Sequence, residues 1–357
     1  MKKIGICTLH DAYPNFGALL QAYAMQEVLK DLGYDVEFLK FKDDTNKELL
    51  RIKRLLHKVY KNEAKFKKIS MRYTGVDTKN IVINSKLKIS RKHLNISSKI
   101  YDPEEKFDSI LVGSDELWNI NNPSFEHRRE YYGHDLGSNN IFTYAPSCNT
   151  TTIEEFNKFH NNKIDFSMFK NLSARDLNTK KLLEEISKRD VTLVLDPTML
   201  YENMLSHAVE PKEKEYILVY DYRVTEKRKK QIQQLAKEKN LPIYSIGFYC
   251  DFADKNIDAD IFEFMGYMKN ASYVVTATFH GTIFSILSKR QFVSCASLGY
   301  KIQDLLKRFE LEDRDSSESD NIIEMIDKKI DYDKVERLLK EKRKESMDYL
   351  TKALKGE

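Results

Sequence analysis

Short apolar segments alternate with helix-like segments from the first residues of the chain. Residues 4–9 form an apolar run of strand length, residues 15–29 carry apolar side chains at helical spacing, and residues 36–41 form the next apolar run. Gly33 follows the helical segment, where a glycine readily adopts the left-handed conformation that ends a helix. Strands separated by helices usually pair in parallel, so this order predicts a parallel sheet covered by helices.

The alternation is interrupted once and then returns. Residues 42–100 are polar and rich in lysine, and we interpret them as a helical insert in the first domain. Strand-like runs resume at residue 109, and the charged, irregular stretch of residues 201–215 is the predicted linker. A second series of strands and helices follows it, and a last helix is predicted over residues 332–355.

Two successive series of this kind predict the fold class. We expect an α/β, GT-B-like fold of two Rossmann-like parallel-sheet domains with an interdomain cleft. The domains are predicted at residues 1–205 and 206–330, and a helix within residues 331–357 is free to pack back on the N-terminal domain. Ligands of open parallel sheets bind beyond the carboxyl ends of the strands, so polar motifs at those ends are the candidate sites.

Charge and cysteine content argue against several classes of protein. The chain has 59 basic and 55 acidic residues and a formal net charge of +4, which does not favour nucleic-acid binding. The four cysteines show no CxxC spacing, so we expect no structural zinc and no other metal site. The sequence has no recognisable secretory signal and no apolar run long enough to span a membrane, so we expect a cytoplasmic protein.

The insert is strongly basic at its start. Residues 42–72 contain 11 Lys or Arg and 4 Asp or Glu. Such a run is typical of a solvated surface. The alternative is a peripheral contact with anionic lipid, or with a lipid-linked substrate, at the inner face of the membrane.

The strongest candidate site joins a strand directly to a helix at residues 276–282. His280 lies at the predicted helix N-terminus, where free backbone N–H groups attract anions. Gly281 lets a ligand approach the backbone, and Thr278 and Thr282 add hydroxyl groups. The structural alternative is that Thr278 only caps the helix and His280 is a hydrogen-bonded turn residue.

Two further motifs follow strands of the first domain. Arg175 stands between a short strand and a helix, where its guanidinium can bind a carboxylate or phosphate with two hydrogen bonds; the alternative is a salt bridge with Asp176 or a neighbouring acid. Ser114 and Asp115 end an apolar strand, and Trp118, the only tryptophan, follows them. We interpret Trp118 as a sugar platform in the cleft; the alternative is a capping role for Asp115 and a core role for Trp118.

A fourth motif lies between the first strand and the first helix. Asn15 and Gly17 shape a turn there, and Gln21 lies one turn into the helix; helix capping is the structural alternative. The pattern is not GxGxxG, and Walker A, HExxH and GxSxG patterns are absent from the chain. We therefore make no dinucleotide or nucleoside-triphosphate prediction.

These segments together resemble the polysaccharide pyruvyl transferase family. The resemblance covers most of residues 2–314, in the expected order, through KIGICTLHDAYPNFGALLQAYAMQEVLKDLGYDVEFLKF, FDSILVGSDELWN, LSARDLNTKKLLEE, LVLDPTML, TATFHGTIFSILSKRQFV and KIQDLLKRFELEDR. The family's His-Gly falls on His280 and Gly281, its Ser-x-Arg on Ser173 and Arg175, and its Gly-Ser-Asp on residues 113–115. Residues 146–149 and Ala277, where the family usually has Asp or Asn, depart from the pattern.

The resemblance implies transfer of a pyruvyl group from phosphoenolpyruvate to two hydroxyls of a glycan sugar, forming a cyclic ketal in surface polysaccharide synthesis. Phosphoenolpyruvate is then a co-substrate, the partner is a sugar or lipid-linked oligosaccharide acceptor, and no cofactor is expected. The acceptor is expected on the N-terminal domain and the donor on the C-terminal domain. The chemistry needs a general acid/base, which a histidine supplies, and cations and N–H dipoles for the donor's anionic groups.

The predicted site residues fall into three groups. The expected catalytic residues are His280, Arg175 and Asp115. The expected donor-binding residues are Arg175, Thr278, His280, Gly281 and Thr282. The expected acceptor-binding residues are Asn15, Gly17, Gln21, Ser114, Asp115 and Trp118.

Two other functions remain open from the residues. A GT-B glycosyltransferase would bind the diphosphate of a nucleotide-sugar at the same helix N-terminus, although no acidic ribose clamp is recognisable. A non-catalytic glycan- or anion-binding protein is the other alternative, and the alanine at position 277 is its support.

Overall fold

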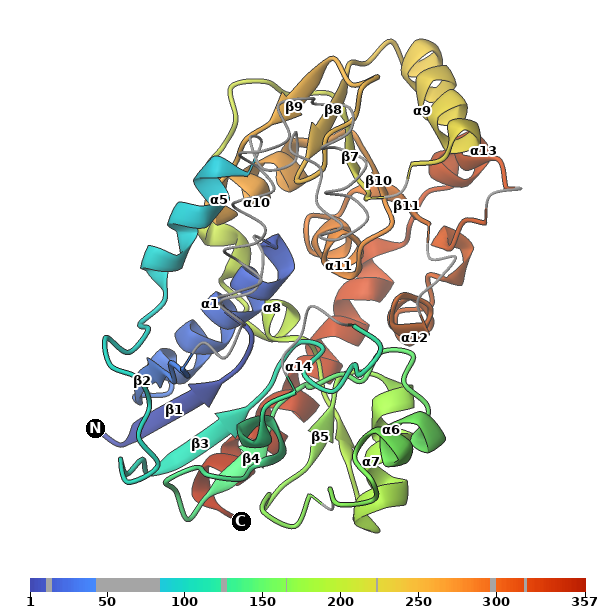
Figure 1. The fold of residues 1–357 in the computed structure, drawn as a ribbon. Helices are drawn as coiled ribbons and strands as arrows, with labels where there is room; N and C mark the ends of the chain where they lie inside the picture. The colour runs from blue at the N-terminus through green and yellow to red at the C-terminus, as the bar shows by residue number, and fades with distance from the viewer. Residues whose placement is uncertain are drawn as a thin grey trace, which may run out of the picture.

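The chain folds into two α/β units, each built on a parallel sheet (Figure 1). The computed structural model describes residues 1–10, 15–42, 84–122, 127–164, 166–222, 224–295, 300–317 and 320–357. The first half of the chain contains β1 (Lys3–Cys7), α1 (Phe16–Asp31), β2 (Asp35–Phe38), α5 (Ser85–Ile89), η1 (Ser90–His93), β3 (Ser109–Val112), η2 (Arg129–Tyr132), β4 (Ile141–Thr143), α6 (Ile153–Phe159), β5 (Ser173–Ala174), α7 (Leu177–Ser187), β6 (Thr192–Leu193), α8 (Pro197–Leu200) and η3 (Met204–His207).

The second half repeats the alternation and ends in a long helix. It contains β7 (Ile217–Tyr220), α9 (Glu226–Lys239), β8 (Ile243–Ile246), β9 (Lys255–Ile257), α10 (Ile261–Asn270), β10 (Tyr273–Thr276), α11 (Phe279–Leu287), β11 (Gln291–Ser294), α12 (Tyr300–Arg308), η4 (Glu312–Arg314), α13 (Ile322–Asp327) and α14 (Tyr332–Lys355). The short elements β9, α12 and α13 were not predicted from the sequence.

The strand order confirms the predicted fold class. The first sheet has the order β2-β1-β3-β4 and the second the order β11-β10-β7-β8-β9, and all of their neighbouring strands run parallel. The parallel pair β5-β6 extends the first sheet, because a parallel bridge joins Phe142 in β4 to Asn171 before β5. In both units the loops after the strands therefore open on the carboxyl edge of a parallel sheet.

Helix ends follow the capping residues of the sequence. Asn15 caps α1 by accepting a hydrogen bond from the Gly17 N–H at 2.8 Å. Thr152 and Glu155 form the predicted capping box of α6. Beyond the other end of α1, Gly33 has φ +84°, the left-handed conformation that glycine adopts readily. Local sequence therefore sets where these helices begin and end.

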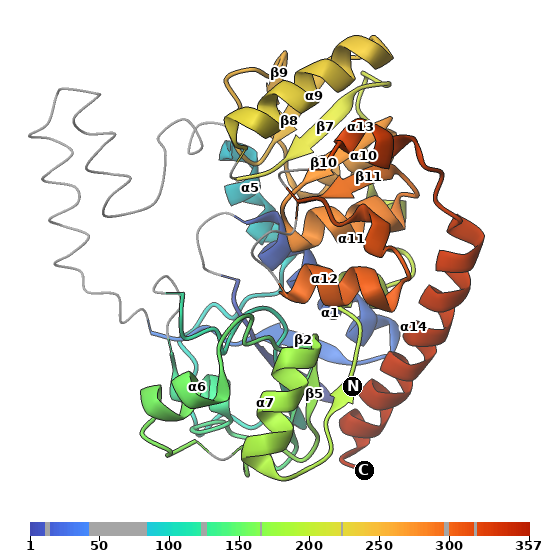
Figure 2. The same ribbon diagram turned by 90° about the vertical axis from the view of Figure 1, so that its right-hand side faces the viewer.

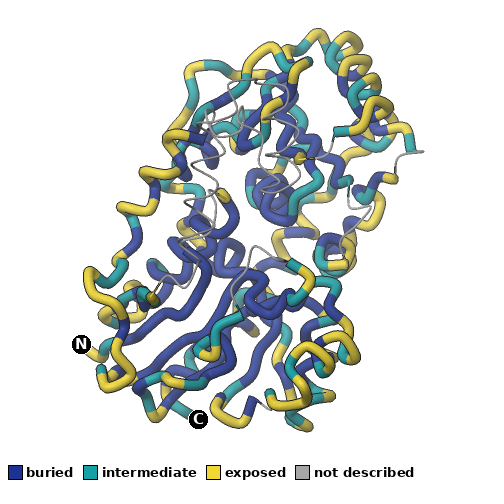
Figure 3. Tube along the Cα trace, in the orientation of Figure 1, coloured by how far each residue is buried: buried dark blue, intermediate teal, exposed yellow. Residues whose placement is uncertain are grey.

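One apolar cluster runs through both units. It includes Ile4 in β1, Leu20 in α1, Leu218 in β7, Ile283 in α11 and Leu350 in α14, all of them buried. The burial map shows the continuous buried region passing from one sheet to the other (Figure 3). Large apolar interfaces hold units in a fixed relative position, so residues from both units can form one site.

The last helix connects the second unit to the first. Figure 2 shows α14 running along one side of the molecule from one unit to the other. Ser346 Oγ accepts a hydrogen bond from the Leu195 N–H at 2.9 Å, and the Tyr349 hydroxyl donates to the Thr143 carbonyl at 2.8 Å. The sequence left open whether this helix returns to the first domain, and these contacts place it there.

The insert lies partly outside the described residues. Residues 43–83 contain nearly all of the basic run, so the predicted membrane contact lies outside the described residues. The end of the insert contacts the second unit: the Asn84 amide donates to the Gly247 carbonyl at 2.9 Å, and Lys86 pairs with Glu263 at 2.7 Å. Of the helices within the described ranges, none is both long and apolar enough to cross a membrane.

Candidate active site

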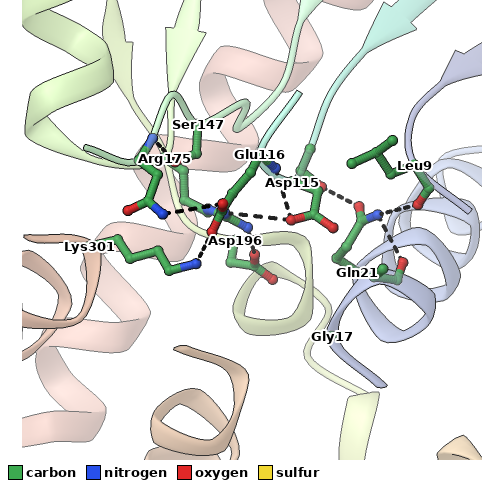
Figure 4. A network of polar contacts seen from close by, with 12 residues as sticks. Leu9, Gly17, Gln21, Asp115, Glu116, Ser147, Arg175, Asp196 and Lys301 are labelled. Atoms are coloured by element: carbon green, nitrogen blue, oxygen red, sulfur yellow. Dashed lines mark hydrogen bonds and ion pairs between the residues drawn. The ribbon is translucent and has the colours of Figure 1, made fainter. Parts of the chain in front are cut away.

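Polar residues of both units meet where the strands of the first sheet end. The loops after β3, β5 and β6 carry Asp115, Arg175 and Asp196, and the start of α11 brings His280 from the second unit. Figure 4 shows Arg175, Asp196 and the neighbouring Glu116 close together, with Lys301 reaching them from α12. We call Arg175, Asp196 and His280 the central cluster.

Asp196 connects the members of the central cluster. Its Oδ2 lies 3.0 Å from Arg175 Nη1 and 3.5 Å from His280 Nε2. Its Oδ1 accepts hydrogen bonds from the Thr198 N–H at 3.0 Å and the Thr198 hydroxyl at 2.6 Å. Burial raises the pKa of Asp196, but its contacts with His280 and Arg175 outweigh burial and hold the pKa well below the usual range. The carboxylate is therefore ionised at neutral pH.

Arg175 is buried, yet it has hydrogen-bonding capacity left over. The residue is 3% exposed. Of its guanidinium nitrogens, only Nη1 donates a hydrogen bond to a side chain, that of Asp196. Nε and Nη2 have no hydrogen-bond partner within the described part of the chain, and Nη2 lies 3.9 Å from Asp115 Oδ1. Unpaired buried donors cost free energy unless a ligand or water satisfies them. The guanidinium therefore has two donors left for a ligand or water to satisfy.

A phenylalanine lies between two cations beside the central cluster. The Phe279 ring centroid is 4.6 Å from the Arg175 guanidinium carbon and 5.5 Å from Lys301 Nζ. Lys301 also forms an ion pair with the buried Glu116. Burial raises the pKa of Glu116, but the contacts with Lys301, Arg175 and Asn119 together outweigh burial and lower the pKa to about 2. Lys301 and Glu116 thus form a second charged contact between the units.

His280 is held by a close approach between α11 and α1. The residue is 9% exposed, and its Nε2 makes no hydrogen bond within the described ranges. A Cβ atom at Gly17 would lie 2.1 Å from His280 Nδ1, well inside van der Waals contact. Gly17 is thus required to make room for the imidazole, a role that differs from the predicted contact with the acceptor.

The start of α11 is capped and closely packed. The Thr278 hydroxyl accepts a hydrogen bond from the Gly281 N–H at 2.9 Å, so Thr278 does cap the helix. A side chain at Gly281 would collide with Thr276, because its Cβ would lie 2.1 Å from the threonine hydroxyl. Thr282 is fully buried and hydrogen-bonded to the Thr278 carbonyl and to Ser294. The prediction that Thr282 binds the donor is therefore wrong.

Three predicted acceptor-binding residues have internal partners instead. Asn15 caps α1. Gln21 is fully buried; its amide donates to the carbonyls of Ala18 and Leu9, and its oxygen accepts from the Ser114 hydroxyl. We call Gln21, Ser114 and Thr8 the Gln21 cluster, because the Thr8 hydroxyl donates to the Ser114 carbonyl at 3.0 Å. The structure contradicts acceptor binding by Gln21 and Ser114, since burial and hydrogen bonding leave them nothing to offer a ligand.

Trp118 is a core residue and not a sugar platform. Its side chain is 0% exposed, and its indole N–H donates to the Tyr131 carbonyl at 2.9 Å. Its ring packs against Tyr132 and Phe166 at centroid distances of 6.4 and 5.0 Å. The core alternative considered for this residue is the one that the structure supports.

Asp115 lies next to the central cluster in an unusual backbone conformation. Its φ is +77°, which non-glycine residues rarely adopt and which is found more often at functional sites. Its carboxylate accepts a hydrogen bond from the Glu116 N–H at 2.8 Å and faces Arg175 Nη2. Of the predicted residues, Asp115, Arg175 and His280 are thus brought together.

Sequence reasoning missed four residues of this region: Asp196, Glu116, Phe279 and Lys301. Asp196 could have been identified from the sequence, since it follows a predicted strand and precedes a proline. Lys301 lies one residue before Ile302, whose spacing to Leu305, Leu306 and Phe309 is helical. No cluster of three or more metal-ligating side chains occurs among the described residues. The site offers an imidazole and anion-binding donors, which suit acid/base chemistry on an anionic substrate.

Solved structures with a similar fold include several UDP-GlcNAc 2-epimerases. One has 9% identity and a TM-score of 0.52 over 98% of this chain and 94% of that one. The enzyme of Neisseria meningitidis bound to UDP-GlcNAc has 11% identity and a TM-score of 0.50 over 99% and 100%. That of Methanocaldococcus jannaschii with UDP-GlcNAc and UDP has 11% identity and a TM-score of 0.50 over 95% and 99%. At such identities the likeness shows the GT-B-like fold alone.

Family-level similarity is more specific. No curated protein matches the chain. The sequence model of the family described as polysaccharide pyruvyl transferase matches residues 15–298, which is well over half of the chain and spans the loops that carry the central cluster. The chain is therefore a transferase and belongs to the polysaccharide pyruvyl transferase family.

Proposed function

We propose that this transferase moves a pyruvyl group from phosphoenolpyruvate to two hydroxyls of a glycan sugar, forming a cyclic ketal in surface polysaccharide synthesis. One observation carries the proposal: Arg175 leaves Nε and Nη2 unpaired beside His280 at the start of α11. Phosphoenolpyruvate has a carboxylate and a phosphate, which suit a guanidinium and a helix N-terminus respectively. No cofactor is needed in this scheme.

The proposed chemistry uses His280 as the acid/base. Protonation of C3 of phosphoenolpyruvate makes C2 electrophilic, and one sugar hydroxyl then adds at C2. A second hydroxyl displaces the phosphate, so one pyruvyl group becomes a ketal and inorganic phosphate leaves. His280 is the residue that we assign to proton transfer; its Nε2 has no hydrogen bond within the described ranges and lies 3.5 Å from Asp196 Oδ2. Arg175 and the α11 N–H groups would stabilise the charge on the donor.

We propose a sugar or lipid-linked oligosaccharide as the acceptor, bound on the first-unit side near Asp115. Asp115 is a suitable partner for a sugar hydroxyl because its carboxylate lies beside Arg175. We also propose that the enzyme works in the cytoplasm at the inner face of the membrane. Co-sedimentation with anionic vesicles at low salt, lost at high salt, tests the membrane contact.

A nucleotide-sugar is the alternative donor, since the start of α11 would also attract a diphosphate. Incubation of the protein with phosphoenolpyruvate or with nucleotide-sugars, each with a set of glycan acceptors, separates the two functions. We expect inorganic phosphate to be released from phosphoenolpyruvate in an acceptor-dependent manner. Release of nucleotide from a nucleotide-sugar, without phosphate release from phosphoenolpyruvate, would reject the proposal.

A further inference from the structure

One buried carboxylate connects the two units at the centre of the site. Asp196 belongs to the first unit and His280 to the second, and their Oδ2 and Nε2 atoms are 3.5 Å apart. The same Oδ2 holds Arg175 Nη1 at 3.0 Å. Two functional groups from different parts of the fold thus depend on one oxygen atom for their relative position.

The carboxylate is itself held rigidly. Asp196 caps α8, and its Oδ1 accepts two hydrogen bonds from Thr198. Oδ1 is thereby committed to the helix, while Oδ2 faces Arg175 and His280. A capping aspartate alone would need only the first of these contacts. The contacts of Oδ2 with Arg175 and His280 therefore indicate a role beyond helix capping.

The charged groups around His280 leave Asp196 as its direct counter-charge. Glu116 is paired with Lys301, and Asp115 faces Arg175 at 3.9 Å. Within the described ranges, Asp196 is the carboxylate at ion-pair distance from the imidazole. An opposite charge at this distance favours the charged form of a titrating group.

We propose that Asp196 is a positioning residue: its carboxylate fixes the imidazole of His280 relative to the guanidinium of Arg175 and balances the charge of the imidazole when it holds a proton. The second half of this statement rests on the proposed function, because it uses proton transfer by His280. The first half concerns only the geometry and charge of the protein.

Asp176 provides a matched control. It is another buried aspartate that follows a strand of the same sheet and caps a helix, with its Oδ1 bound to the N–H and the hydroxyl of Thr179 at 2.8 and 2.7 Å. Its Oδ2 accepts a hydrogen bond from Ser147 at 2.6 Å, and it forms no ion pair with His280. Asp176→Asn therefore removes a similar buried charge and perturbs a similar cap, at a carboxylate whose hydrogen bonds go to Ser147 and Thr179 and not to Arg175 or His280.

The test is a pH titration of ¹³C-labelled histidine rings by NMR, with the His280 signal assigned by its loss in His280→Gln. In Asp196→Asn we expect the titration midpoint of this signal to fall by roughly 1 pH unit or more, the effect of removing an opposite charge within about 4–6 Å. In Asp176→Asn we expect it to stay at the wild-type value. An unchanged midpoint in folded Asp196→Asn would overturn the proposal, as would equal falls in both variants.

Loss of Asp196 leaves the buried Arg175 without its nearest counter-charge, so the single variant can fail to fold. Arg175→Gln, with and without Asp196→Asn, then makes the same comparison in a protein that lacks this buried cation. We expect the midpoint to fall on adding Asp196→Asn, and no fall would overturn the proposal. These titrations need neither donor nor acceptor. Absence of phosphoenolpyruvate binding by the wild type would therefore reject the proposed function separately.

Discussion

Two buried polar clusters lie side by side at the carboxyl edge of the first sheet, and they differ in how completely their hydrogen-bonding groups are used. In the Gln21 cluster the amide and hydroxyl groups of Gln21 and Ser114 have protein partners. In the central cluster, Arg175 Nε and Nη2 and His280 Nε2 have no hydrogen-bond partner within the described ranges. Because buried polar groups are normally paired, we propose the unpaired set as the ligand site and assign the paired set a structural role.

The same contrast separates the two helix starts that the sequence treated alike. Both α1 and α11 follow a strand and begin with a capping residue and a glycine. At α1 the glycine leaves room for His280, whereas α11 carries the histidine itself. We therefore assign a structural role to the start of α1 and a catalytic role to the start of α11. The following predictions test this division, from the largest expected effect on turnover to the smallest.

The largest effect is expected from His280→Gln. Glutamine keeps a polar side chain of similar reach but cannot exchange a proton, so turnover should fall by about 10²–10⁴-fold, the usual contribution of a positioned acid/base. Phosphate release from phosphoenolpyruvate measures it, with calorimetry to show that the variant is folded and still binds the donor. Turnover close to that of the wild type would remove His280 from the mechanism.

Gly17→Ala should also impair turnover, although residue 17 performs no chemistry. The new Cβ would lie 2.1 Å from His280 Nδ1, so the imidazole has to move. Misplacement of a reacting group by about 1 Å can cost on the order of 10²-fold in rate. Gly33→Ala, near the other end of α1, is the control: nothing lies within 4 Å of its Cβ, but its φ of +84° costs stability. If both variants have the same turnover, Gly17 does not act through His280.

Arg175→Lys should weaken donor binding. Lysine keeps the charge but loses the planar set of donors, and we expect a loss of about 1–3 kcal/mol in the binding free energy of phosphoenolpyruvate, measured by calorimetry. Arg189→Lys is the control, because Arg189 donates to two backbone carbonyls, of Phe169 and Lys170, outside the site. Equal donor affinity in wild type and Arg175→Lys would make Arg175 a structural residue.

Gln21→Met should have the smallest effect on turnover. It leaves the buried Ser114 hydroxyl without its acceptor, so the free energy of unfolding should fall by about 1–3 kcal/mol. Donor affinity and turnover at a temperature where the variant is folded should match the wild type. Denaturant unfolding measures the loss of stability, and calorimetry measures the donor affinity. Loss of donor affinity without loss of stability would show that the Gln21 cluster also binds the donor.

The fold was predictable from sequence because alternation and capping are local signals. The parallel sheets follow from the βαβ order, and Arg175 and His280 were found because both follow strands of parallel sheets. The partner of His280 was not predictable: Asp196 is 84 residues away in the sequence and in the other unit, and no spacing encodes that contact. The prediction for Trp118 was wrong because its burial depends on packing against Phe166, a residue distant in the sequence, and no local pattern indicates that contact.

A crystal structure with phosphoenolpyruvate tests the central claim most directly. We expect the donor to contact Arg175 Nε or Nη2 with one anionic group and the start of α11 with the other, near His280, while the hydrogen bonds of Gln21 and Ser114 stay unchanged. Donor bound away from Arg175 and His280, with their nitrogens still unpaired, would contradict the account.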